Sequence, residues 1–96
     1  MRYRLHDGIV YARIKNVYLL IATRQAWDEF PSVKTLSPVF GWFASGIANG
    51  MSLDEIRNDQ KLNQRLSRAV IERKLNQFIE EMTKENYIVE DDNAEQ

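Results

Sequence analysis

The chain has 96 residues, no cysteine, one histidine, 44% hydrophobic residues and a formal net charge of −1. Its length fits one compact domain with a modest core. The composition excludes disulfides and zinc sites built on cysteine and histidine, and the charge excludes a global field that would attract nucleic acid or an anionic membrane.

Neither a secretory signal nor a membrane span is visible in the sequence. The residues after Met1 are charged and polar, and the longest apolar run, Val17 to Ala22, is too short to cross a bilayer. A cytoplasmic location without membrane contact is therefore expected.

Residues 9 to 22 predict a β-hairpin, because IVYARI and VYLLIA are rich in β-branched and aromatic residues. The polar pair Lys15-Asn16 separates them, and asparagine tolerates the positive φ that such a turn needs. The second strand is apolar throughout, so the pattern leaves open which face of the hairpin meets the core.

The connection from Thr23 to Pro31 contains two large aromatic residues, Trp27 and Phe30, which we expect to cap one end of the core. Residues 32 to 36 then predict a third strand, with β-branched Val33 and Thr35. A three-stranded sheet leaves two open edges, which display unpaired N–H and C=O groups. Lys34 on such an edge would prevent random pairing or contact an acidic partner.

Ser37 and Pro38 predict the start of an apolar helix, as N-cap and first helical residue. Buried-face spacing continues to Ile47, and Asn49-Gly50 predicts the stop. A second, brief helix should follow at once, because Ser52-Leu53-Asp54-Glu55 has the pattern of a capping box.

A long third helix is predicted from about Ser67 to Asn86. Its apolar stripe is formed by Ile71, Leu75, Phe78 and Met82. The short apolar segment Tyr87-Ile88-Val89 should pack back on the core. We therefore predict one α+β domain over residues 1–89, a winged helix-turn-helix with a three-stranded antiparallel sheet followed by three helices, and a frayed acidic tail over residues 90–96.

Nothing in the sequence indicates catalysis. His6 is isolated, there is no thiol, and no serine has a base nearby in the sequence. Adjacent carboxylates such as Glu80-Glu81 diverge on a helix and do not share a metal ion. We therefore expect no enzyme activity, no metal site and no cofactor.

The informative charges are basic. Lys61, Arg65 and Arg68 cluster near the start of the long helix, where the helix dipole disfavours cations by about 0.3–1 kcal/mol each. They share one side only if the helix already runs through residue 61, and Glu72 follows Arg68 by one turn. A solvated face with an Arg68–Glu72 pair and a groove wall for an acidic ligand are both open interpretations, and the position beside the apolar stripe favours the groove.

The order of these motifs resembles the PqqD-like family, the pyrroloquinoline quinone biosynthesis protein D family. Its members are small winged-helix recognition elements for ribosomally synthesised, post-translationally modified peptides. The segments that carry the resemblance extend over residues 8 to 89: Val33 to Leu36, Ser37 to Asn49 with Trp42-Phe43, Gly50-Met51-Ser52-Leu53-Asp54-Glu55-Ile56, Leu75-x-x-Phe78-Ile79-x-x-Met82, and Tyr87-Ile88-Val89. Asn86-Tyr87 departs from the pattern, because a glycine often ends the last helix there.

The resemblance implies a non-catalytic module that binds the leader of a precursor peptide by β-augmentation. The leader would add to strand three and lie against the last helix, and the module would deliver it to a peptide-modifying enzyme such as a radical SAM protein, a cyclase or a leader peptidase. The residues implied for this site are Val33, Lys34, Thr35 and Leu36 for main-chain pairing, with Lys61, Arg65, Arg68, Glu72 and Ile79 on the groove wall.

Two other functions remain open. A winged helix-turn-helix can bind DNA, here through Arg65, Arg68, Arg73 and Lys74. This alternative ranks second because the chain is net acidic and the hairpin turn offers only Lys15. A scaffold that only oligomerises through its open edge is the third possibility.

Overall fold

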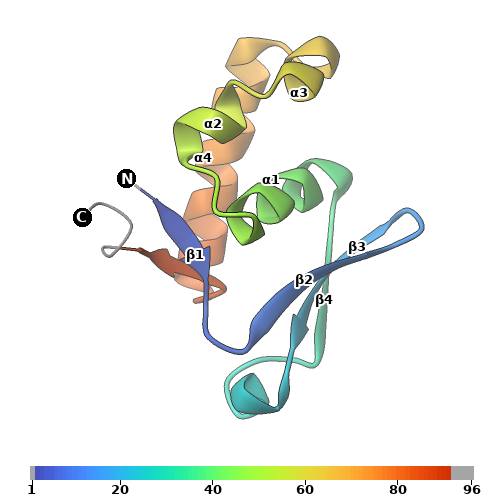
Figure 1. Ribbon diagram of the computed structural model, residues 1–96, viewed down its shortest axis with the longest axis vertical. Helices are drawn as coiled ribbons and strands as arrows, with labels where there is room; N and C mark the ends of the chain where they lie inside the picture. Colours follow the sequence, from blue (N-terminus) through green and yellow to red (C-terminus); the bar gives the residue numbers. More distant parts are fainter. Residues whose placement is uncertain (1, 92–96) are drawn as a thin grey trace.

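The computed structural model describes residues 2–91, which form an α+β fold (Figure 1). A three-stranded antiparallel sheet has the order β2-β3-β4, and a separate pair joins β1 to β5. The predicted fold class is confirmed, and the three predicted helices are α1, α2 and α4. The elements are β1 (Tyr3–Leu5), β2 (Ile9–Ile14), β3 (Val17–Ala22), the 3-10 turn η1 (Arg24–Ala26), β4 (Val33–Leu36), α1 (Pro38–Ala48), α2 (Leu53–Arg57), α3 (Gln60–Arg65), α4 (Arg68–Lys84) and β5 (Ile88–Glu90).

The hairpin β2–β3 resolves the question of which face meets the core. Ile9 pairs with Ala22 and Tyr11 pairs with Leu20, and these four side chains point toward α1 and the core. The turn differs from the prediction in one detail, because the positive φ of 56° belongs to Lys15 and not to Asn16.

Helix α1 begins and ends as predicted. The Ser37 hydroxyl accepts a hydrogen bond from the Phe40 N–H at 3.2 Å, and Pro38 is the first helical residue. Gly50 follows the helix with a φ of +80°, the left-handed conformation that favours glycine. Helix α1 contacts all three strands of the sheet. Its Gly41 lies so close to Tyr18 of β3 that an added Cβ would be 2.4 Å from the ring.

The segment after Gly50 contains one more helix than predicted. Ser52 and Glu55 form the expected capping box at the start of α2. The short helix α3 then begins at Gln60, and its N-cap Asp59 accepts a hydrogen bond from the Leu62 N–H at 3.0 Å. Leu66 has an extended conformation and Ser67 caps α4, so α3 and α4 are two separate helices.

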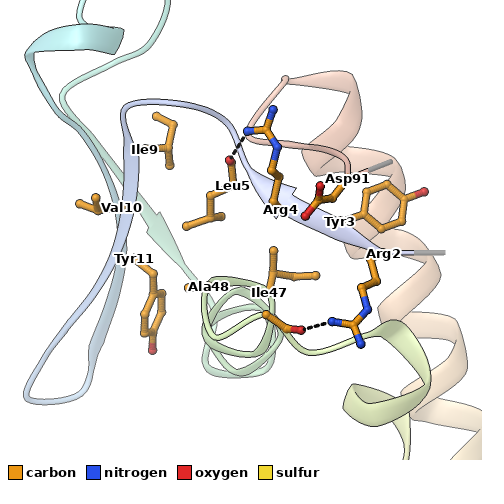
Figure 2. Close-up of a pocket in the computed structure, with 11 residues that line it drawn as sticks. Arg2, Tyr3, Arg4, Leu5, Ile9, Val10, Tyr11, Ile47, Ala48 and Asp91 are labelled. Atoms are coloured by element: carbon orange, nitrogen blue, oxygen red, sulfur yellow. Dashed lines mark hydrogen bonds between the residues drawn. The ribbon is translucent and has the colours of Figure 1, made fainter. Parts of the chain in front are cut away.

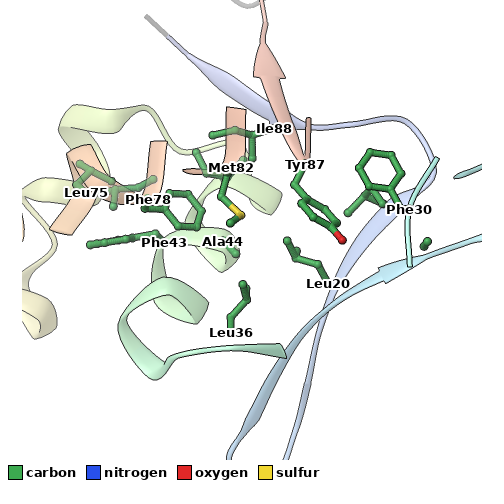
Figure 3. Packing of buried hydrophobic residues seen from close by; sticks show 14 of the residues in the cluster. Leu20, Phe30, Leu36, Phe43, Ala44, Leu75, Phe78, Met82, Tyr87 and Ile88 are labelled. Atoms are coloured by element: carbon green, nitrogen blue, oxygen red, sulfur yellow. The ribbon is translucent and has the colours of Figure 1, made fainter. Parts of the chain in front are cut away.

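Helix α4 supplies the central apolar stripe of the core. Phe78 is fully buried and meets two rings of α1, Phe40 at 5.2 Å and Phe43 at 5.5 Å between ring centroids, both edge to face. Figure 3 shows this cluster continuing past Met82 to Leu20 and Leu36 of the sheet. These contacts hold α4 against α1.

The end of α4 turns back through Asn86, which has a φ of 67° and takes the left-handed position where a glycine often stands. Tyr87 and Ile88 are buried, so the predicted return of the apolar segment to the core is confirmed. Strand β5 then pairs with β1. Strand β1 was not predicted from the sequence. Glu90, the first residue of the predicted tail, belongs to β5, and residues 92–96 lie outside the described residues.

In the connection between β3 and β4, one of the two aromatic residues caps the core as predicted and the other does not. Phe30 is buried against His6 and Tyr87. Trp27 is 59% exposed and does not cap the core, although its Nε1 donates a hydrogen bond to the Ala22 carbonyl at 3.0 Å. The indole is held at the surface by that bond and by the nearby Arg24 guanidinium.

Replacing Gly41 with alanine should destabilise the domain by about 1–3 kcal/mol, because a methyl group there overpacks the contact between α1 and β3. Urea unfolding of Gly41→Ala and the parent chain measures the difference. The control is Asn76→Ala at an exposed position of α4, which should change the free energy of unfolding by no more than about 0.5 kcal/mol. Equal stability of Gly41→Ala and the parent would contradict this account of how α1 sits on the sheet.

Candidate functional site

Strand β4 forms one open edge of the sheet, because β3 is its only neighbour in the strand order β2-β3-β4. The Ala22 N–H donates to the Ser32 carbonyl at 3.0 Å, so the pairs Leu20–Lys34 and Tyr18–Leu36 also carry the hydrogen bonds between β3 and β4. The N–H and C=O groups of Val33 and Thr35 therefore point away from β3. No strand within residues 2–91 pairs with them.

A groove of about 330 Å³ runs between this edge and α4. Residues of β4 form one wall of the groove, residues of α4 form the other, and Phe40 of α1 also lines it. The lining residues are Lys34, Thr35, Leu36, Ser37, Phe40, Lys74, Gln77, Glu81 and Met82. An open strand edge beside a groove is the arrangement that accepts an extended peptide as an additional strand.

Lys34 lies at the end of the groove near the C-terminus of α4. Its Nζ is 3.1 Å from the Glu85 carboxylate and 5.7 Å from the centre of the Tyr87 ring. Burial raises the pKa of the Tyr87 phenol, and the nearby Lys34 ammonium opposes that shift. Lys34 therefore has an acidic partner within the chain already.

The groove wall of α4 differs from the predicted one. Successive residues of an α-helix are about 100° apart, which places Arg68, Glu72 and Ile79 roughly 120–160° around α4 from Lys74. Gln77 and Glu81 lie on the same side as Lys74 and line the groove. The structure does not bring Arg68, Glu72 or Ile79 to this groove.

The predicted basic strip is divided by the break between α3 and α4. Arg68 donates to the Asn58 side chain at 2.7 Å and lies 3.6 Å from Glu72, which in turn lies 3.1 Å from Arg57 of α2. These contacts match the interpretation of a structural Arg68–Glu72 pair.

The two remaining members of the strip lie on α3. Lys61 is exposed. Arg65 borders a small apolar cavity of about 170 Å³ beside Tyr18 and Trp42. The basic residues named for DNA binding also diverge, since Lys74 lines the β4 groove and Arg68 faces α2.

The sequence contained a signal for the residues of α4 that line this groove. Lys74, Gln77 and Glu81 recur at i, i+3 and i+7 directly beside the buried stripe of α4. Their mixed charge resembles that of an ordinary solvated face, whereas the residues of the basic cluster all have the same sign of charge.

A larger cavity of about 500 Å³ lies away from β4, between β1, β2 and the end of α1 (Figure 2). The arginines at its rim already have partners. Arg2 donates to the Gly50 carbonyl at 2.9 Å, and Arg4 lies 2.9 Å from the Asp7 carboxylate. Leu5, Ile9 and Ile47 form its apolar side. At β4, an open strand edge and a groove lined by α4 coincide.

Residues 2–91 contain no cluster of histidine, aspartate and glutamate that could hold a metal ion. No helix in this part of the chain is both long and apolar enough to span a membrane.

Comparison with known proteins identifies the fold. No family model matches the sequence, and no curated protein matches it. The structure is similar to that of TbiB1 in complex with the TbiA(beta) leader peptide, with a TM-score of 0.70 and 19% sequence identity. The match covers 92% of this chain and 99% of TbiB1. The winged-helix fold implied by the family resemblance is therefore shared with a protein whose structure contains a leader peptide.

Proposed function

We propose that this chain is a non-catalytic recognition domain that binds the leader of a ribosomally made precursor peptide. The observation that carries the proposal is the open edge of β4 beside the groove against α4, in a fold shared with a leader-peptide complex. The leader adds as a fourth strand, and the domain presents it to a peptide-modifying enzyme. A radical SAM protein, a cyclase or a leader peptidase fits this role.

The main chain supplies the first part of the recognition. Val33 and Thr35 each offer an N–H donor and a C=O acceptor at the open edge, which an extended peptide of any sequence can use. Successive side chains of the leader then alternate between the groove and the opposite face of the sheet. The groove therefore contacts the side chain of every second leader residue.

The charges of the groove favour one order of charged residues in a leader that pairs antiparallel with β4. Lys34 lies near Glu85 at the end of α4, whereas Phe40, just after β4, contacts Phe78 farther back. Strand β4 therefore runs antiparallel to α4, and a leader antiparallel to β4 runs parallel to α4. Its earlier residues pass Lys74 and its later residues pass Glu81, so a leader with an acidic residue before a basic one fits best.

Thr35→Pro should weaken leader binding about tenfold or more, because proline removes a main-chain donor from the open edge without breaking a bond to β3. Fluorescence anisotropy with a labelled leader of the precursor encoded beside this chain measures the affinity. Thr35→Ala is the matched control, because it keeps the N–H and should bind like the parent. Circular dichroism checks that both variants remain folded, and unchanged affinity of folded Thr35→Pro would refute strand addition at β4.

Charge reversal tests which side of α4 forms the groove wall. Lys74→Glu should weaken binding of a leader that carries an acidic residue there by about two- to tenfold, since the pair is partly screened by solvent. Arg68→Glu, the same change on the other side of α4, should leave the affinity unchanged.

The same anisotropy titration compares both variants, with a random DNA duplex as a second probe at moderate salt. A larger loss of leader affinity in Arg68→Glu than in Lys74→Glu would show that the leader binds at the basic strip and not in the β4 groove. Steeply salt-dependent DNA binding without leader binding would refute the proposed function.

A further inference from the structure

The face of the sheet that points away from α1 is almost entirely apolar. Seven of its eight side chains are aliphatic, and the eighth is a threonine. Four of the aliphatic side chains are exposed to a large extent: Val10 by 44%, Ile14 by 58%, Val17 by 45% and Val33 by 50%. We call this surface the outer face; it consists of Val10, Ala12, Ile14, Val17, Leu19, Ile21, Val33 and Thr35.

An outer face of this kind needs an explanation. An antiparallel sheet with one face on the core normally presents polar side chains on the other face. Helix α1 covers the opposite face, which carries Leu20 and Leu36, and within residues 2–91 no α-helix lies over the outer one (Figure 1). The apolar side chains on the inner side of β3 pack in the core. Those on its outer side do not pack there and have no role in leader binding at the edge of β4. A contiguous exposed apolar patch marks an interaction surface.

We propose that the outer face is the contact surface between two copies of this chain, which stack sheet on sheet. The face carries no charged side chain, so its complement is another flat, uncharged and aliphatic surface. The outer face of a second copy has this character. Two antiparallel sheets pack in this way at about 10 Å, with interdigitating β-branched side chains, in β-sandwiches. A two-fold axis makes such a contact closed, which limits the assembly to a dimer.

The small area of the face is typical of a weak contact. Three strands of up to six residues cover about 14 by 20 Å, or roughly 300 Å² for each copy, from the strand spacing and the rise per residue. Stable specific interfaces bury about 800 Å² for each partner, so a contact of this size is weak and reversible. Any element that widens the face strengthens the dimer.

The leader is such an element, and this step rests on the proposed function. A fourth strand at β4 widens the face by about a third, and every second leader side chain lies beside Val33 and Thr35 on the outer face. The groove remains open in the dimer, because Lys34 and Leu36 point to the opposite side of the sheet. Leader binding and dimerisation therefore favour each other, by the same factor in both directions.

Sedimentation velocity between about 10 μM and 1 mM tests the dimer with this chain alone. We expect a monomer at the lowest concentration and a growing dimer fraction above it. Val10→Lys combined with Val17→Lys should remove the dimer, because it puts charges into the apolar contact. The matched control adds the same two charges at exposed helical positions, Gln64→Lys with Asn76→Lys, and should dimerise like the parent. Thermal unfolding checks that all three proteins are folded.

A second series adds a saturating amount of the leader used in the anisotropy titration. We expect the dimer to form at a severalfold lower protein concentration. A monomer throughout the range, with and without leader, would overturn the dimer, as would a dimer that persists in Val10→Lys with Val17→Lys. A leader that binds without changing the dimerisation constant overturns the coupling. Failure of the leader to bind at all overturns the proposed function and leaves the dimer of the free chain standing.

Discussion

The edge-to-face packing of two phenylalanine rings of α1 on Phe78 of α4 determines where the site lies. Strand β4 continues directly into α1 through Ser37 and Pro38, so the position of α1 also fixes the position of β4. Because Phe40 and Phe43 hold α1 against α4, the open edge of β4 remains beside the helix at the width of a groove. Phe40 is part of both arrangements, since it contacts Phe78 and also lines the groove.

The sequence predicted those parts of the fold that depend on local chemistry. Caps at Ser37 and Ser52, the apolar stripe of α4 and the turn after it depend on residues close together in the chain. Strand β1 escaped prediction because it has three residues and is stabilised by pairing with β5 at the other end of the chain. Only tertiary contacts decide such a strand.

In the candidate site, too, the part set by local sequence was predicted and the part set by tertiary packing was not. The strand Val33–Leu36 was predicted, but main-chain pairing through all four residues was not correct. Only Val33 and Thr35 present free main-chain groups, because those of Lys34 and Leu36 bond to β3. The helix wall required the rotation of α4 about its own axis, which depends on how Phe78 and Met82 pack in the core. The break at Leu66 and Ser67 also separates residues that a continuous helix would have aligned. The residues that line the groove lie beside the buried stripe of α4, whereas the uniformly positive residues of the basic strip do not line it.

One strand edge and one sheet face meet along β4, and they differ in what they recognise. The edge offers main-chain groups that bind any extended chain, which is a risk of uncontrolled pairing unless charged or polar residues limit it. Lys34, held by Glu85, stands at that edge and is joined by Lys74 and Glu81 across the groove. In the proposed complex, these charges would select among extended chains by their side chains, whereas the outer face, without any charge, would select only by shape and apolar area. In the proposed complex, a strand that fits the groove also enlarges the apolar face, so the proposed peptide recognition and the proposed dimer would depend on the same added strand.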